Sequence, residues 1–148
     1  MAERISAFLD TSALFAAVWS DQGGARMILK LGEAGAVTLL VSPQVIKEAD
    51  GALKRKAPEA LPLLAILLDR SGVAVVDAAP HKTVSALSFV TGHAGDAQIV
   101  ADALQAKADY LITLDREHLL GNERLAEAAG IPIGTPGDFL AWFRGRLP

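Results

Sequence analysis

Residues 5–12 have the sequence Ile5-Ser6-Ala7-Phe8-Leu9-Asp10-Thr11-Ser12, in which a short apolar run ends at an aspartate. The apolar run, followed at once by helical spacing in residues 11–19, predicts a buried strand that passes directly into a helix. A second apolar run, residues 110–114, also ends at an aspartate, Asp115. Because ligands of open α/β sheets bind beyond the carboxyl ends of the strands, Asp10 and Asp115 converge if these strands are neighbours.

Strands and helices alternate along the rest of the chain. Strands are predicted at residues 5–9, 37–41, 73–76, 110–114 and 131–133. Helices are predicted at residues 11–19, 22–30, 43–56, 58–69, 81–90, 96–106, 122–129 and 139–143, with a loop at 91–95. Nearly continuous apolar strands separated by helices indicate a parallel sheet that is covered on both faces. No repeat or linker divides the sequence, so residues 1–148 are expected to form one α/β domain.

Composition and charge exclude several classes of protein. The 148 residues are 51% hydrophobic and 21% charged, which is enough to build a core, and the absence of Cys excludes disulfides and thiolate chemistry. Residues 1–6 lack the apolar segment of a signal peptide, and no apolar run approaches the ~20 residues of a membrane span. We therefore expect a cytoplasmic protein without a membrane segment. A net charge of −3 argues against coating nucleic acid by bulk charge.

Two further acids lie near predicted helix starts. Asp96 begins an Ala-rich helix after a Gly-containing loop, and Glu48 lies in the first turns of the helix at 43–56. Each has an ordinary interpretation, because helix dipoles favour acids in a first turn and Glu48 could lie on a solvated face. Asp10 and Asp115 taken singly could be turn residues or helix caps. Taken together they favour a site, because they adjoin hydroxyl residues: Thr11, Ser12 and Thr113.

Five segments in the same order resemble the motifs of PIN-domain ribonucleases. They are 8–14 (FLDTSAL), 41–48 (VSPQVIKE), 95–104 (GDAQIVADAL), 108–115 (ADYLITLD) and 132–140 (PIGTPGDFL). The resemblance is closest to small prokaryotic VapC-like toxins of toxin–antitoxin pairs. It implies a three-layer α/β/α fold with a central parallel sheet of about five strands in the order 3-2-1-4-5. It also implies a metal-dependent endoribonuclease that hydrolyses phosphodiester bonds of RNA.

The resemblance implies a particular set of site residues. The acids expected to be catalytic and to hold Mg²⁺ or Mn²⁺ are Asp10, Glu48, Asp96 and Asp115, with Glu48 serving a second ion or acting through water. The residues expected to orient them are Thr11, Ser12, Thr113 and Glu117. Four clustered carboxylates must bind protons or a cation, and hard divalent ions suit carboxylate ligands. Because such ions do not favour imidazole, we interpret His118 as a helix-face or substrate-side residue.

Basic residues near the motifs are candidates for binding RNA phosphates: Arg116, Lys54, Arg55 and Lys56. The run at 54–56 could equally serve the dipole at the end of its helix. Without the four acids the net charge changes from −3 to +1, so the remaining surface does not repel phosphate. Aromatic residues, at 5%, are too few for an extended base-stacking surface.

Two other functions fit parts of the sequence. In a haloacid-dehalogenase-type phosphatase Asp10 would be the nucleophile. Such enzymes usually have a second aspartate two residues later, but this chain has Ser12 at that position. A catalytically inactive PIN-fold interaction protein is the other alternative.

The stretch 59–69 is apolar almost all round a helix, so it is either buried in the domain or, as we favour, an interface. The resemblance implies a homodimer and a small antitoxin protein as partners.

Overall fold

A computed structural model of the chain describes residues 4–147, and one parallel sheet forms its centre. Its strands are β1 (Ser6–Leu9), β2 (Thr38–Val41), β3 (Ala74–Val75), β4 (Tyr110–Ile112) and β5 (Ile133–Gly134), in the order β3-β2-β1-β4-β5. The predicted parallel sheet and its strand order are therefore confirmed. Residues 1–3 and 148, included in the single-domain prediction and in the interpretation of the N-terminus, lie outside the described residues.

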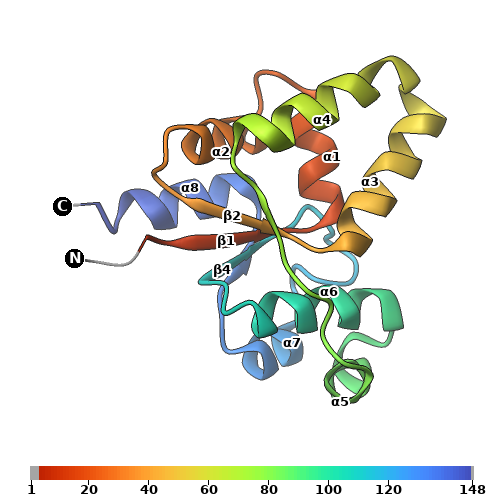
Figure 1. Cartoon of the computed structure of the whole chain (residues 1–148). Helices are drawn as coiled ribbons and strands as arrows, with labels where there is room; N and C mark the ends of the chain where they lie inside the picture. The colour runs from red at the N-terminus through yellow and green to blue at the C-terminus, as the bar shows by residue number, and fades with distance from the viewer. Residues whose placement is uncertain (1–3, 148) are drawn as a thin grey trace.

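Helices cover both faces of the sheet (Figure 1). They are α1 (Thr11–Trp19), α2 (Gly24–Glu33), α3 (Pro43–Lys56), α4 (Leu61–Arg70), α5 (His81–Thr91), α6 (Ala94–Gln105), α7 (Glu123–Ala129) and α8 (Pro136–Arg144), with a short 3-10 helix, η1 (Pro58–Ala60), before α4. Helices α1, α2 and α4 lie on one side of the sheet, and α5, α6 and α7 lie on the other. This arrangement confirms the three-layer α/β/α fold. Within residues 4–147, no helix has both the length and the apolar character needed to cross a membrane.

The register of the central strands brings the two strand-exit motifs together. Phe8 pairs with Leu111 and Leu9 with Ile112 across β1 and β4, and all four side chains are fully buried. The backbone N–H of Asp10 then donates to the carbonyl of Ile112 at 3.1 Å. Substituting alanine for a buried residue such as Phe8 costs about 3–5 kcal/mol, so this pairing is held firmly.

Several predicted boundaries differ from the structure at helix ends. Helix α6 begins at Ala94, two residues before its predicted start at 96. The loop predicted at 91–95 is therefore shorter in the structure. Helix α8 begins at Pro136 instead of 139, because Thr135 caps it: its hydroxyl accepts from the Asp138 N–H, and the Asp138 carboxylate accepts from the Thr135 N–H. The segment 135–138 is expected from the sequence to cap this helix, and in the structure its last three residues already belong to the first helical turn.

Helix α4 is not wholly buried, so that alternative for its apolar sequence is wrong. Leu64 packs into the core with 5% of its surface exposed, while Ile66 is 47% exposed. Asp69 and Arg70 at the end of the helix are also exposed. One side of α4 therefore covers the core, and an apolar residue remains on its outer side.

Candidate active site

Asp10 is held at the end of β1 by two hydroxyl residues and one backbone amide. Its Oδ1 accepts hydrogen bonds from the Ser12 hydroxyl at 2.7 Å and the Ala13 N–H at 2.9 Å, so the carboxylate caps helix α1. Its Oδ2 accepts a hydrogen bond from the hydroxyl of Thr113, just beyond β4. With only 3% of its surface exposed, Asp10 is fixed in one orientation.

The same hydroxyl groups also fix the segment that carries Asp115. The Thr113 oxygen accepts from the Asp115 N–H at 3.0 Å, and the Ser12 oxygen accepts from the Leu114 N–H at 2.9 Å. Each hydroxyl thus donates to Asp10 and accepts from the backbone after β4. The predicted orienting roles of Ser12 and Thr113 have this geometric basis. Thr11 lines a cavity that Asp10 and Asp115 also line, but its buried hydroxyl oxygen has no hydrogen-bond partner among the described residues.

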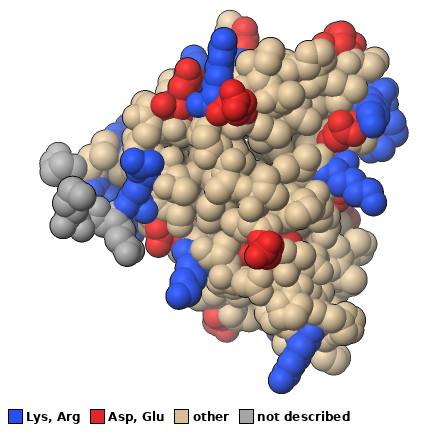
Figure 2. All heavy atoms as spheres, in the orientation of Figure 1, with Lys and Arg blue, Asp and Glu red and all other residues tan. Residues whose placement is uncertain are grey.

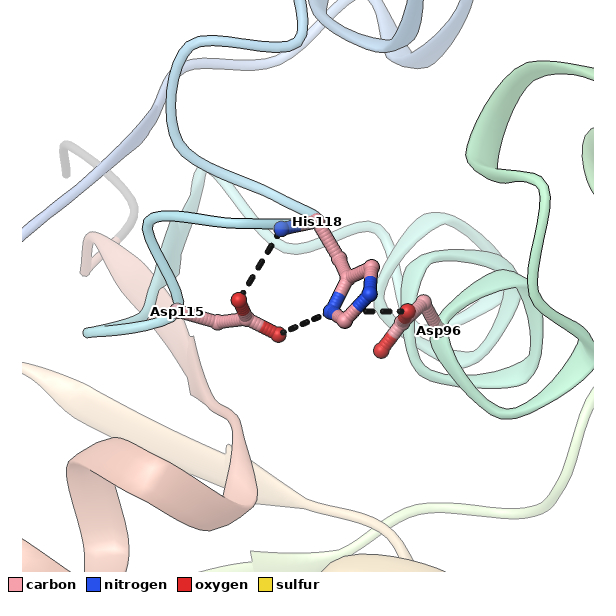
Figure 3. A group of neighbouring side chains, drawn as sticks. All are labelled: Asp96, Asp115 and His118. Atoms are coloured by element: carbon pink, nitrogen blue, oxygen red, sulfur yellow. Dashed lines mark hydrogen bonds and ion pairs between the residues drawn. The ribbon is translucent and has the colours of Figure 1, made fainter.

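Asp115 organises a tight turn that carries His118. Its Oδ1 accepts from the N–H groups of Glu117 and His118, both at 3.0 Å, and its Oδ2 lies 3.3 Å from the His118 ring nitrogen Nδ1. Asp96, in the first turn of α6, approaches from the other side, with its Oδ2 3.8 Å from the same nitrogen. Figure 3 shows the imidazole lying between the two carboxylates. Ligand atoms of these three residues all lie within 4.8 Å of one another.

Burial and mutual repulsion shift the protonation of the acids. Burial is the main cause of a raised pKa at Asp10, opposed by hydrogen bonds from Ser12, Thr113 and Ala13. Burial also raises the pKa of Asp96, opposed chiefly by His118. The hydrogen bond to Asp115 raises the pKa of His118. Burial therefore disfavours the charged forms of Asp10 and Asp96, and a bound cation would favour them.

Glu48 reaches the site from helix α3 and is exposed. The side-chain amide of Gln44, one turn earlier, donates to Glu48 Oε1 at 2.8 Å and to the Gly95 carbonyl at 3.4 Å. Gln44 thus links α3 to the start of α6. One cavity of about 500 Å³ is lined by all four predicted acids, Asp10, Glu48, Asp96 and Asp115.

The predicted phosphate-binding residues do not all reach this cavity. Lys56 lines it, and Arg55 lines an adjoining depression that also contains Glu48. Lys54 is paired with Asp50 at 2.8 Å. Two residues, Arg116 and Glu117, line a separate depression. Figure 2 shows Lys and Arg scattered among acids on the visible face, without a continuous basic surface.

The structure places two histidines at this site, of which His93 is not among the predicted residues. The imidazole of His118, expected on a helix face or the substrate side, lies against Asp115 and Asp96. His93, which caps α6, places its Nδ1 3.7 Å from Asp96 Oδ2, and the two imidazole rings lie 5.8 Å apart. Each histidine is three residues from an acid, a spacing that puts side chains on one side of a helical turn. That spacing was the available signal.

The carboxylate oxygens have the free capacity that a cation needs. Asp96 Oδ2 is buried and accepts no hydrogen bond from the described residues. Asp10 Oδ2 accepts a single hydrogen bond, so a lone pair remains. Oxygen ligands of this kind suit hard divalent ions, and the imidazole of His118 adds a nitrogen that borderline ions accept. The residues present therefore fit a divalent metal ion.

The protein is of the class with a parallel sheet of order 3-2-1-4-5 and an acidic cluster at its carboxyl edge. The model of a family described as PIN domain matches residues 6–117, and the chain belongs to this family. PIN domains are generally metal-dependent nucleases. The solved structures include a similar one, described as the crystal structure of PAE2754 from Pyrobaculum aerophilum. It is 19% identical, with a TM-score of 0.66, over 96% of this chain and 97% of that chain. No curated protein matches the chain.

Proposed function

We propose that the protein is an endoribonuclease that hydrolyses RNA with Mg²⁺ or Mn²⁺ bound at its acidic centre, and that residues 1–148 form one domain. The observation that carries this proposal is that Asp10, Glu48, Asp96 and Asp115 line one cavity, with ligand atoms of Asp96 and Asp115 within 4.8 Å of each other. The buried Asp96 Oδ2, which accepts no hydrogen bond from residues 4–147, supports a bound cation at this point.

The residues divide the work by position. Asp96 and Asp115 would hold the ion, with Asp10 beside them in the same cavity. When bound, such an ion activates water and stabilises the charge that develops on a phosphodiester. Ser12 and Thr113 keep the carboxylate of Asp10 and the backbone of Asp115 in register through their paired hydrogen bonds.

Glu48 completes the acidic centre from α3, at a second ion or through water. The amide of Gln44 donates to its carboxylate and so restricts it. Substrate phosphates are held by Lys56 at the cavity and by Arg55 beside it. Lys54 and Arg116, which lie away from the cavity, act on more distant phosphates, and Glu117 acts on Asp115 through their shared turn.

The protein acts as the toxin of a toxin–antitoxin pair, as a cytoplasmic homodimer with a small antitoxin partner. The support for the toxin role is the resemblance of the motifs to VapC-like toxins. The support for an interface is helix α4, where Ile66 leaves 47% of its surface exposed on a helix that buries Leu64 on its other side.

A circular single-stranded RNA tests the proposal, because only an endonuclease can open it. We expect the purified protein to linearise the circle with Mg²⁺ or Mn²⁺ and not with EDTA. Intact circles under all conditions would support an inactive interaction protein instead. Release of phosphate from an aryl phosphate, without cleavage of RNA, would support the phosphatase alternative.

A further inference from the structure

Two helices, α1 and α3, line the cavity from the acidic centre outward. Thr11, Phe15 and Trp19 of α1 recur every fourth residue, and so do Glu48, Ala52 and Lys56 of α3. Residues with this spacing lie on one face of a helix. The acids lie at one end of the groove, and the aromatic rings and Lys56 lie at the other.

The far end of the groove is an aromatic stack open to solvent. The rings of Phe15 and Trp19 lie 5.7 Å apart and are inclined by only 17°, and Trp19 is 59% exposed. The ammonium group of Lys56 lies 5.4 Å from the centre of the Phe15 ring. An exposed tryptophan ring stacked on a phenylalanine that has a cation over it suits a planar base attached to a phosphate.

We propose that Trp19 and Phe15 form a subsite that stacks an unpaired nucleobase of the RNA, with Lys56 holding an adjacent phosphate. This inference rests on the proposed function, because it takes the strand from the acidic centre along the groove. Trp19 lies eight residues beyond Thr11, about 12 Å along the helix axis. A strand with one phosphate at the acids therefore reaches Trp19 within a few nucleotides.

The stacking subsite indicates whether the RNA substrate is paired or unpaired. A base in a duplex is stacked on both faces and has no free face for the indole, whereas an unpaired base does. The enzyme is therefore selective for single-stranded RNA, or for loops, over the paired strand. The stack is one pair of rings, which agrees with an aromatic content too low for an extended surface.

Tryptophan fluorescence reports on this subsite directly. The chain has two tryptophans, so Trp142→Phe leaves Trp19 as the single emitter, and Trp19→Phe is the matched variant that leaves Trp142. The probes are an adenosine hexamer and a hexamer of the same ribose-phosphate backbone without bases, with Ca²⁺ in place of Mg²⁺ or Mn²⁺. We expect the adenosine hexamer to quench Trp19 and not Trp142. The hexamer without bases, which carries the same charge, binds roughly 5- to 100-fold more weakly.

The substitutions then separate stacking from charge. We expect Trp19→Ala to weaken binding of the adenosine hexamer roughly 5- to 100-fold and to raise KM more than it lowers kcat. Lys56→Gln weakens both hexamers alike, because it removes a phosphate contact. Equal binding of the two hexamers by the wild type, or unchanged binding by Trp19→Ala, would overturn the subsite.

The outcome is distinguishable from failure of the proposed function. RNA cleavage without a change in Trp19 fluorescence would support the proposed nuclease and overturn the subsite. Quenching of Trp19 by the adenosine hexamer without RNA cleavage would support the subsite and overturn the proposed nuclease. A third outcome is that neither hexamer quenches Trp19 fluorescence, while quenching by acrylamide weakens as the protein concentration rises. The groove would then be a contact between protein chains, and the subsite would be overturned.

Discussion

The hydroxyl of Thr113 donates a hydrogen bond to Oδ2 of Asp10, and so joins the ends of two neighbouring strands. The same oxygen accepts from the Asp115 N–H at 3.0 Å. One buried side chain therefore sets the position of one acid and the backbone of another. The acidic centre depends on this residue although it carries no charge.

Thr113→Val keeps the side-chain shape and removes both hydrogen bonds. Loss of a partner for a buried polar group costs about 1–3 kcal/mol, so we expect the free energy of unfolding in urea to fall by that amount. RNA cleavage should also slow, since Asp115 loses its anchor. Thr113→Ser retains the hydroxyl and is the control. Equal stability and rate in the two variants would show that the hydroxyl does not organise the centre.

Asp96→Asn should stabilise the metal-free protein. The folded pKa of Asp96 is raised from its usual value of 3.8, so the folded state holds this proton to higher pH than the unfolded state does. Ionisation of Asp96 therefore destabilises the fold progressively as the pH rises from about 4 through the folded pKa. We expect Asp96→Asn to melt on the order of 2–5 °C higher in EDTA at pH 7, and the gap to narrow towards pH 4.

Asp10→Asn should act in the same direction, because burial also raises the pKa of Asp10. A melting temperature at or below that of the wild type in EDTA, for both variants, would contradict the repulsion argument.

Divalent ions should stabilise the wild type. A ligand at 100 times its Kd adds about 2.7 kcal/mol to the free energy of unfolding. We expect Mn²⁺ to raise the melting temperature of the wild type and to raise that of Asp96→Asn much less. Equal shifts in the two proteins would place the ion elsewhere, a result that calorimetric titration with Mn²⁺ can check independently.

His118 should make the stability of the metal-free protein depend on pH. Its hydrogen bond to Asp115 raises its folded pKa above the usual 6.5. The stabilisation by protonated His118 is therefore complete below about pH 6.5 and is lost as the pH rises through the folded pKa. We expect the melting temperatures of the wild type and His118→Gln in EDTA to differ most near pH 6 and to converge at alkaline pH. A difference independent of pH would mean that His118 contributes by packing alone.

Ile66→Glu should separate the proposed dimer without unfolding the chain, because Ile66 lies on the exposed side of α4. Light scattering at micromolar concentration should give a dimer for the wild type and a monomer for the variant. Thr83→Glu places the same charge at an exposed position of α5 and should remain dimeric. A monomeric wild type would contradict the homodimer. Leu64→Glu is unsuitable for this test, since Leu64 belongs to the core.

The strands and the positions of Asp10 and Asp115 at strand ends were predictable because their signals are local. Short apolar runs ending at Asp10 and Asp115 mark where parallel strands deliver their side chains, whereas Glu48 and Asp96 lie on helices and were expected at the site only from the resemblance of their segments to PIN-domain motifs. The three-residue spacing pairs His118 with Asp115 and His93 with Asp96, but no such signal predicts the contact between His118 and Asp96. The ring of His118 reaches Asp96 only because the Asp115 turn and helix α6 meet in space, and no pattern within either segment encodes that meeting.

The sequence also does not predict which side of α4 faces the core. A helix with apolar residues nearly all round gives no indication of which side faces the core, so only the packing separates Leu64 from Ile66. The basic run at 54–56 shows the same limit. Lys56 is at the cavity and Lys54 is paired with Asp50, although both belong to one charged stretch.

The most direct test is the rate of cleavage of a single-stranded RNA in Mn²⁺ by the wild type, Asp115→Asn and Glu127→Gln, all purified identically. Glu127 is an exposed carboxylate on α7, away from the cavity, and controls for a change of charge and for contaminating nuclease. If the acidic centre performs the cleavage, Asp115→Asn is slower by roughly 100- to 1,000-fold while Glu127→Gln equals the wild type. Equal rates in all three proteins, or no cleavage by the wild type, would contradict the proposed nuclease.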